Sequence, residues 1–272
     1  MGSNMNQNVM NKKHRGSGLS KLLVLFYGVV SYFIFLGTFL YAIGFVGNLL
    51  VPKTIDSGFQ GGTSNAWIVN ILLLSLFAVQ HSVMARQGFK KWWTRIIPKS
   101  IERSTFVLVS SLVLILLYYF WRPMPEIIWS VENTLLFYLL TAFFFTGWFI
   151  VLLGTFLINH FNLFGLQQVY LNLKNSEPKP PQFVKPLFYR VVRHPLMLGF
   201  IIAFWAAPQM TLGHLLFAFA TTGYILVAIQ LEERDMVRFH GEDYKRYQQE
   251  VSQIIPLPPK RQVEVLQKNY SD

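Results

Sequence analysis

Two charged clusters flank an uncharged stretch in the C-terminal part of the chain. Residues 189 to 199 read Tyr-Arg-Val-Val-Arg-His-Pro-Leu-Met-Leu-Gly, and residues 232 to 235 read Glu-Glu-Arg-Asp. The 32 residues from 200 to 231 contain no Asp, Glu, Lys or Arg. Such clusters can hold a zwitterionic ligand, because Glu232 and Glu233 can bind an ammonium group while arginines bind a carboxylate. The alternative is that the two clusters only pair with each other.

Pro195 predicts that a helix starts inside the basic cluster, since proline at the first helical position gives up an amide that would be unpaired anyway. The unpaired amides of that first turn and the helix dipole favour an anion such as an amino-acid carboxylate. Arg190 and Arg193 would add charged donors. Gly199 would let a ligand or a neighbouring backbone approach closely. The basic cluster is therefore a candidate binding site for an anionic group.

The uncharged stretch is long enough for a helical hairpin that crosses a bilayer and returns, with its turn near Pro208. Such a hairpin brings the acidic cluster back to the membrane face where the basic one begins. Four more stretches lack any charged residue: 22 to 51, 66 to 85, 104 to 121 and 133 to 158. The chain has 53% hydrophobic and only 14% charged residues, whereas soluble domains average about 25% charged residues. This composition is typical of membrane proteins.

We therefore predict an all-α, polytopic membrane protein with about six transmembrane helices, the last two forming a C-terminal hairpin. Residues 1 to 21 are expected to be disordered, with 1 to 4 a tag remnant. Residues 22 to 272 are expected to form one membrane domain, with its cofactor-binding part at 160 to 256. Residues 232 to 251 are predicted to continue the last span as a cytoplasmic helix that covers the cofactor pocket.

The net charge of +11 reflects membrane topology rather than nucleic-acid binding. If the N-terminus is cytoplasmic, 22 of the 24 Lys and Arg residues fall on that side, and only Lys53 and Arg122 fall outside. This pattern matches the positive-inside rule and predicts cytoplasmic termini, here in a bacterial inner membrane. The basic stretch 86 to 103, with two tryptophans, is expected to include an interfacial helix. The absence of Cys excludes disulfides, thiolate metal sites and a cysteine nucleophile, and we expect no metal.

Four polar segments are predicted to meet at the inner edge of the membrane. They are residues 80 to 82 (Gln-His-Ser), 160 to 169, 193 to 195 and 232 to 233. Polar side chains at membrane depth are costly unless they face a partner or a wet cavity. Their arrival at one face from separate spans predicts a single pocket that opens inward.

The motif Arg193-His194-Pro195-x-x-x-Gly199, followed by Glu232-Glu233 and then Tyr244-x-x-Tyr247, resembles the isoprenylcysteine carboxyl methyltransferase and phospholipid methyltransferase superfamily. Members of that superfamily are integral membrane enzymes that use S-adenosylmethionine. Within it, the chain is more similar to the family of bacterial methanethiol S-methyltransferases, and the resemblance covers roughly residues 65 to 256. The closer match is carried by residues 80 to 85, 102 to 104, 160 to 169, 210 to 214 and 231 to 235.

The resemblance implies which residues bind S-adenosylmethionine. By position they are His194, Pro195, Leu198, Gly199, Glu232 and Glu233. Arg190 is added as a charged donor, and Tyr244 and Tyr247 are added because the cytoplasmic helix would cover the adenosine. Met197 stands where the superfamily usually has tyrosine, so any role of that hydroxyl group is absent here.

The resemblance also implies methyl transfer to a small thiol in a lipid bilayer. A sulfonium donor is already activated, so the enzyme mainly aligns an in-line attack and excludes water. Because the thiolate is the nucleophile, a base or a positive potential helps. His160 and His81 are the candidate bases, and Arg193 would supply positive potential. A small apolar slot for the thiol would be formed by Phe161, Phe164 and Trp205.

Other interpretations stay open at the level of sequence. His81 and His160 could simply hydrogen-bond neighbouring helix ends. A related enzyme would methylate a lipid amine or a prenylcysteine carboxylate instead of a thiol. A protein of a different class would bind haem for redox chemistry, with the two histidines as axial ligands, and a Soret band would reveal it.

Overall fold

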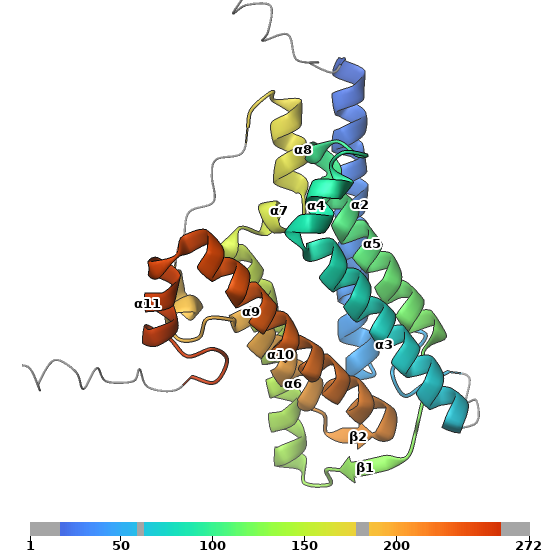
Figure 1. The fold of residues 1–272 in the computed structure, drawn as a ribbon. Coiled ribbons are helices and arrows are strands. Elements are labelled where there is room, and N and C mark those ends of the chain that lie inside the picture. The colour runs from blue at the N-terminus through green and yellow to red at the C-terminus, as the bar shows by residue number, and fades with distance from the viewer. Residues whose placement is uncertain (1–16, 59–62, 178–184, 257–272) are drawn as a thin grey trace, which may run out of the picture. The chain divides into compact units, whose positions relative to one another are not determined.

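The structure, a computed structural model, describes residues 17 to 58, 63 to 177 and 185 to 256 (Figure 1). In chain order the elements are α2 (Gly18–Gly47), α3 (Thr63–Ala85), α4 (Gln87–Trp93), α5 (Lys99–Phe120), β1 (Ile127–Ser130), α6 (Thr134–Ile158), α7 (His160–Leu163), α8 (Leu166–Leu173), η1 (Leu187–Arg190), α9 (Pro195–Trp205), β2 (Gln209–Thr211), α10 (Leu212–His240) and α11 (Glu242–Glu250). The tag remnant at 1 to 4 and most of the disorder predicted for 1 to 21 concern residues outside those described. Helix α2 begins at Gly18, earlier than the span expected from residue 22.

Within the residues that the structure describes, five helices are long and apolar enough to cross a membrane. They are α2, the Asn65–Ala85 part of α3, α5, α6 and α10, with lengths from 21 to 30 residues. At about 1.5 Å per residue, even the shortest spans roughly 31 Å, which matches a hydrocarbon core of about 30 Å. Helix α9 has 11 residues and spans only about 16 Å. The all-α polytopic membrane fold is confirmed, whereas a sixth crossing through α9 stays a prediction.

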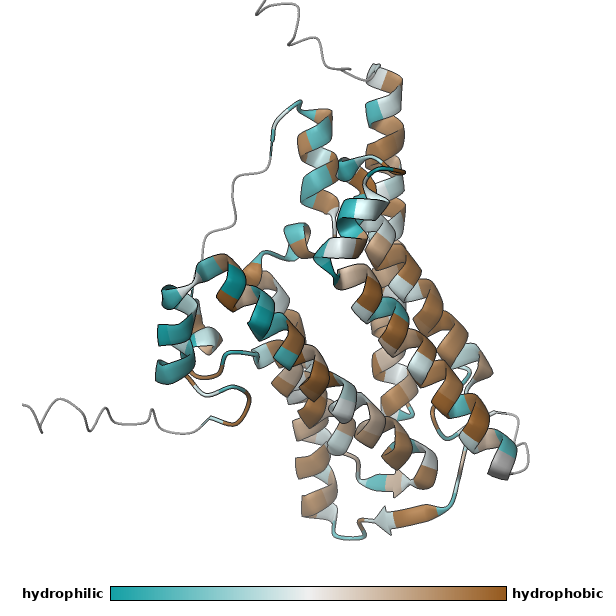
Figure 2. Ribbon diagram, viewed as in Figure 1, coloured by the Kyte–Doolittle hydropathy of each residue, from teal (hydrophilic) through white to brown (hydrophobic). Residues whose placement is uncertain are grey.

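The outer surfaces of these helices carry large hydrophobic side chains. On α6 the exposed ones include Leu135, Tyr138, Phe143, Phe149 and Phe156. A soluble protein rarely exposes so much contiguous apolar surface. Lipid would cover it, as the apolar colouring of the long helices in Figure 2 indicates.

The contacts divide the chain into two compact units, and the expected single domain from 22 to 272 stays a prediction. The first unit comprises Met1–Ala42, Leu76–Leu117 and Asn159–Pro181, and the second comprises Ile43–Ser75, Tyr118–Ile158 and Gln182–Asp272. Helices α2, α3 and α5 each contribute residues to both units.

In the first unit, α7 and α8 lie against α2 and α5. The Tyr27 hydroxyl and the Thr105 hydroxyl, 2.9 Å apart, join α2 to α5. Gly165, between α7 and α8, has φ 89°, and a Cβ there would lie 2.5 Å from Ser104 Oγ on α5. Only glycine fits such a positive-φ turn at this close contact. The turn that follows His160 is thereby fixed on α5.

In the second unit, α9 packs closely along α6 and also contacts α10. A Cβ on Gly199 of α9 would lie 2.7 Å from the Gly147 carbonyl oxygen of α6. Small residues let two helix backbones approach in this way inside a membrane. Helices α9 and α10 form the predicted hairpin, with Pro208 and strand β2 at its turn. Strand β2 pairs antiparallel with β1.

The polar C-terminal region of the second unit has two helices instead of the single continuous one expected from 232 to 251. Helix α10 ends at His240, Gly241 has φ 55°, and α11 runs from Glu242 to Glu250. Glycine adopts a positive φ at a helix end without the steric strain that a Cβ would cause. Figure 2 shows that the end of α10 and all of α11 are predominantly hydrophilic. This polar end carries the acidic cluster.

Candidate functional site

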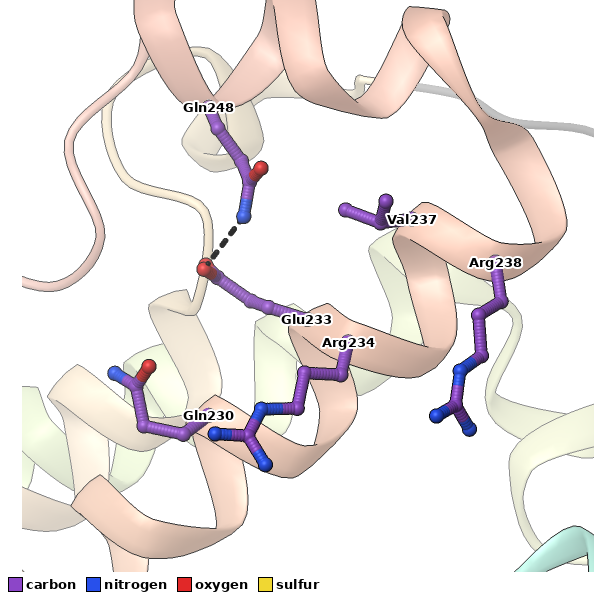
Figure 3. A pocket seen from close by; sticks show the side chains of 6 residues that line it. All are labelled: Gln230, Glu233, Arg234, Val237, Arg238 and Gln248. Carbon is purple, nitrogen blue, oxygen red and sulfur yellow. Dashed lines mark hydrogen bonds between the residues drawn. The ribbon is translucent and has the colours of Figure 1, made fainter.

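Glu233 is the centre of a buried hydrogen-bond network in the second unit. Its side chain is buried, with the residue 6% exposed. Its Oε1 accepts from Arg193 Nε at 2.7 Å and from His194 Nε2 at 3.0 Å. Its Oε2 accepts from Gln248 Nε2 at 2.9 Å, as drawn in Figure 3, and from Arg193 Nη2 at 3.3 Å. An ionised carboxylate only accepts hydrogen bonds, so the Nε2 of His194 carries a proton.

The chain after α11 holds the basic cluster from its other side. The backbone amides of Arg193 and His194 donate to the carbonyl oxygens of Ser252 and Gln253 at 2.8 and 3.1 Å. Arg193 Nη1 donates to the carbonyl oxygen of Gln248 at 3.0 Å and to that of Val251. The side chains of Arg193, His194 and Glu233 are thus held together by segments that are far apart in sequence. The contacts of Glu233 agree with the alternative interpretation, in which the two charged clusters pair with each other.

Glu232 differs from its neighbour because its side chain is half exposed. Its Oε2 lies 3.7 Å from Nδ1 of the buried His194. The two consecutive carboxylates therefore have separate environments: Glu233 is saturated by protein donors, and Glu232 faces the surface. Of the acidic pair, Glu232 has the greater capacity to bind a ligand.

Three tyrosines lie near the acidic pair: Tyr189 of the basic cluster, and Tyr244 and Tyr247 of α11. Tyr244 and Tyr247 of α11 are buried, and the Tyr247 hydroxyl donates to the Tyr189 carbonyl oxygen at 2.5 Å. The Tyr189 hydroxyl is buried without a hydrogen-bond partner in the part of the chain that the structure describes. Burial, and then the charge of Glu232, raises the pKa of Tyr189, so its hydroxyl stays protonated and can donate. A buried donor without a partner is a position where a ligand acceptor fits.

An open pocket of about 330 Å³ lies beside this network (Figure 3). It is lined by Gln230, Glu233, Arg234, Val237, Arg238 and Gln248. Arg234 and Arg238 lie one helical turn apart, so they share a side of α10. Both are exposed, and Arg238 Nη1 lies 3.6 Å from Asp235 Oδ1. The volume falls within the range of small-ligand sites, and the cations suit an anionic group.

The other predicted cofactor residues have mixed placements. Pro195 is the first residue of α9, as predicted, and the N-cap residue His194 makes no side-chain capping hydrogen bond. Leu198 is partly buried in α9, and Gly199 admits the neighbouring backbone of α6 rather than a ligand. Arg190 is exposed and donates from Nε to the Lys185 carbonyl oxygen at 3.2 Å. The structure therefore adds no direct indication of ligand contact at Gly199.

Trp205, predicted to line the thiol slot, is not brought to the Glu233 network. It lies at the other end of α9 from Pro195, and ten residues of helix span about 15 Å. Its Nε1 donates to Thr222 Oγ1 at 3.0 Å, and its ring lies 4.8 Å from that of Phe219. Trp205 serves the packing of α9 against α10.

The two candidate bases belong to the first unit. His160 is 4% exposed, and its Nε2 lies 2.8 Å from the Tyr32 hydroxyl. The ring of Phe164 lies 4.8 Å away and that of the largely exposed Phe161 lies 5.6 Å away. Burial lowers the pKa of His160, so the imidazole is neutral near pH 7. A neutral imidazole is the form that acts as a base.

His81 lies in the same unit on α3. Its Nδ1 is 3.3 Å from Ser110 Oγ, and its ring lies 5.3 Å from Phe77 and 4.8 Å from Phe106. Phe106 also belongs to a buried cluster against which Phe164 packs. The first unit thus holds both histidines and the predicted slot residues Phe161 and Phe164. Their meeting with the second unit's residues in one pocket stays a prediction.

Sequence reasoning missed three residues that the structure places beside predicted ones. Gln248 and Tyr189 adjoin the Glu233 network, and Tyr32 adjoins His160. Gln248 directly follows Tyr247, and Tyr189 is the first residue of the basic cluster. Both could have been found as sequence neighbours of predicted site residues. Tyr32 lies in an apolar span without a nearby polar motif, so no pattern in the sequence pointed to it.

Comparison with known proteins gives the family. Residues 69 to 253 match the family described as NnrU protein. Methanethiol S-methyltransferase 1 of Bradyrhizobium diazoefficiens is 56% identical over 241 residues, which cover 89% of this chain and 85% of that protein. Methanethiol S-methyltransferase of Mycobacterium tuberculosis is 54% identical over 240 residues, 88% of this chain and 98% of that protein.

A more distant similarity extends to animals. Human nurim is 28% identical over 184 residues, which cover 63% of this chain and 67% of that protein. No solved structure matches the chain. The family match and the two bacterial relatives each cover more than two thirds of this chain. The chain belongs to the NnrU family and to the family of methanethiol S-methyltransferases.

Proposed function

We propose that this protein transfers a methyl group from S-adenosylmethionine to the sulfur of methanethiol, forming dimethyl sulfide. The observation that carries the proposal is the 56% identity over 89% of the chain to a protein named methanethiol S-methyltransferase 1. The Glu233 network lies within residues 69 to 253, the part matched by the NnrU family. The protein would act in a bacterial inner membrane with both termini in the cytoplasm.

The second unit has hydrogen-bond donors and acceptors to which S-adenosylmethionine would bind. Bound there, the cofactor supplies a methyl group already activated by a positive sulfur. Glu232 would accept hydrogen bonds from its ammonium or ribose hydroxyl groups, and the pocket arginines Arg234 and Arg238 would bind its carboxylate. Tyr189 supports this fit, because its buried hydroxyl lacks a partner in the described chain. It would donate to a cofactor oxygen or nitrogen.

Arg193 and Glu233 would act by holding other groups rather than by touching the methyl group. Their paired charges are buried, and Glu233 fixes the orientation and the proton of His194. The Arg193 guanidinium also ties the end of α11 to the start of α9. Rigid support of this kind keeps binding groups close to their productive positions.

The thiol has to lose its proton, because the thiolate is the reactive nucleophile. His160, neutral at pH 7, would accept that proton, with His81 as the second candidate base. The thiolate sulfur would then bond to the methyl carbon in line with the carbon–sulfur bond that breaks, with S-adenosylhomocysteine as the leaving group. His160 would return its proton to water.

The test uses purified protein in lipid nanodiscs with methanethiol and S-adenosylmethionine. We expect dimethyl sulfide in the headspace by gas chromatography, and saturable binding of S-adenosylhomocysteine by calorimetry. Samples without the methyl donor are the control. Protein that binds no S-adenosylhomocysteine and makes no methylated sulfide overturns the proposal.

The same preparation separates the rivals. Methylation of a lipid amine or a prenylcysteine carboxylate, with no product from methanethiol, favours a related methyltransferase. A Soret band would favour haem binding at His81 and His160. The names of the bacterial relatives do not support the hypothesis of a haem-binding redox protein.

A further inference from the structure

A tyrosine from the N-terminal span reaches the candidate base across 128 residues of sequence. The Tyr32 hydroxyl on α2 lies 2.8 Å from His160 Nε2 on α7, and both residues belong to the first unit. The two rings meet edge to face, with centroids 5.7 Å apart at 79°. Tyr32 lies outside residues 69 to 253, the part that the NnrU family matches.

The backbone at His160 is held in an unusual conformation. Asn159, which joins α6 to α7, has φ 138°, a region that a non-glycine residue rarely adopts. Its side chain accepts a hydrogen bond from the Asn162 amide at 3.1 Å. Arg103 of α5 donates to the Leu163 carbonyl oxygen at 2.7 Å, on the same turn. Strained residues persist where their surroundings over-determine them, and they concentrate at functional sites.

The groups around His160 are mostly aromatic. Phe161 and Phe164 present their rings from α7 and its C-terminal end. Arg103 of α5 brings a charged group to this turn through its hydrogen bond to the Leu163 carbonyl oxygen, and Tyr32 faces the imidazole from α2. Such surroundings disfavour a charged imidazolium. A base that takes a proton here therefore needs an acceptor for its N–H groups.

We propose that Tyr32 is a positioning residue for His160: its hydroxyl holds the imidazole ring and accepts the Nε2–H of the imidazolium formed when His160 takes the proton of the thiol. The inference rests on the proposed function, because it assigns His160 the part of the base. An imidazolium has N–H donors at both nitrogens, and a phenol oxygen can accept one of them. The hydroxyl thus partly offsets the cost of the charge among aromatic rings.

The test compares Tyr32→Phe with Tyr27→Phe in the full-length protein in nanodiscs. Each substitution removes one tyrosine hydroxyl from α2, but the Tyr27 hydroxyl is bonded to Thr105 instead of a histidine. We expect Tyr32→Phe to lower kcat by about tenfold, part of the 10²–10⁴-fold that a positioned base contributes. The KM for S-adenosylmethionine should not change, and Tyr27→Phe should retain wild-type kcat.

The pH profile gives a readout that a merely structural role would not move. Loss of the acceptor makes the imidazolium less stable, so the pKa of His160 falls further. The acidic limb of kcat should therefore move to lower pH in Tyr32→Phe and stay in place in Tyr27→Phe. Nitrogen-15 NMR of labelled histidine, assigned with His160→Gln, should show the same shift without any substrate.

The outcomes are distinguishable. If the wild type forms no dimethyl sulfide, the proposed function fails and this inference falls with it. If the wild type is active but the two variants have equal kcat and equal pH profiles, only the role of Tyr32 is overturned. A lower melting temperature of Tyr32→Phe with unchanged kcat per folded molecule also overturns it, because the hydroxyl would then contribute to packing and stability only.

Discussion

Glu233 accepts hydrogen bonds from three side chains, so its carboxylate has little capacity left for a ligand. Removing its charge would leave the buried Arg193 guanidinium without a counter-ion. A buried ion pair broken on one side costs about 3–5 kcal/mol. At the scale of single residues, this carboxylate acts on the cofactor through the groups that it orients.

The first prediction concerns Glu233→Gln. We expect a clear fall in melting temperature and at least a tenfold weaker binding of S-adenosylhomocysteine, about 1.4 kcal/mol. The matched control is Glu250→Gln, which removes an exposed carboxylate from an ion pair with Lys185. Surface pairs contribute about 0–1 kcal/mol, so this control should behave as wild type. Equal behaviour of the two variants in both measurements would contradict the prediction.

The second prediction concerns the Tyr189 hydroxyl, whose loss should have opposite effects on stability and on binding. A buried hydroxyl without a partner costs about 1–3 kcal/mol, so Tyr189→Phe should raise the melting temperature of the free protein or leave it unchanged. If the hydroxyl binds the cofactor, affinity for S-adenosylhomocysteine falls several-fold in the calorimeter.

Tyr247→Phe provides the comparison for that experiment. Its hydroxyl already has a protein acceptor, the Tyr189 carbonyl oxygen, so removing it should lower the melting temperature. Unaltered affinity in Tyr189→Phe would show that this hydroxyl does not touch the cofactor.

At the scale of elements, the packing of α9 on α6 sets the position of the basic cluster at the start of α9. The approach depends on Gly199, since an added Cβ would meet both the Gly147 carbonyl oxygen and Val151 within 3.0 Å. Backbone cannot move aside as a flexible side chain can. The two helices would have to separate, and the start of α9 at His194 would move with them.

The third prediction is that Gly199→Ala destabilises the protein by about 1–3 kcal/mol, the usual cost of overpacking. Gly223→Ala on α10 is the matched control, because a Cβ there meets nothing within 4 Å. Alanine is the better helix former by about 1 kcal/mol, so the control should be neutral or stabilising. Thermal unfolding followed by size-exclusion chromatography measures both. Weaker S-adenosylhomocysteine binding at an unchanged melting temperature would instead indicate that Gly199 touches the ligand.

At the scale of the whole molecule, the sequence predicted what depends on local composition. Uncharged runs gave the long helices, and Pro195 gave the start of α9. The break at Gly241 was missed, because the charged residues on both sides keep a helical spacing and glycine alone does not end a helix. The placement of Trp205 and the partners of Glu233 depend on how separate helices pack, which residue spacing does not encode.

The last prediction follows from the tyrosines that join α11 to the rest of the second unit. Burial raises the pKa of Tyr247 to about 12 and that of Tyr244 also above its ordinary value. These groups are neutral in folded and unfolded chains below pH 10, so their packing is fully stabilising there. Above pH 10 the unfolded chain loses their protons first, and stability falls as pH rises. We therefore expect α11 to loosen and S-adenosylhomocysteine binding to weaken between pH 10 and 12.

The alkaline loss can be assigned by comparing two phenylalanine variants. Tyr244→Phe removes one buried titrating hydroxyl, so its melting temperature should fall less steeply above pH 10 than that of the wild type. Tyr138→Phe changes an exposed tyrosine on α6 that has no contact with α11 in the described hydrogen bonds and ring contacts, and its profile should follow the wild type. Parallel profiles for all three proteins would mean that lysine deprotonation, rather than the burial of α11 tyrosines, drives the alkaline transition.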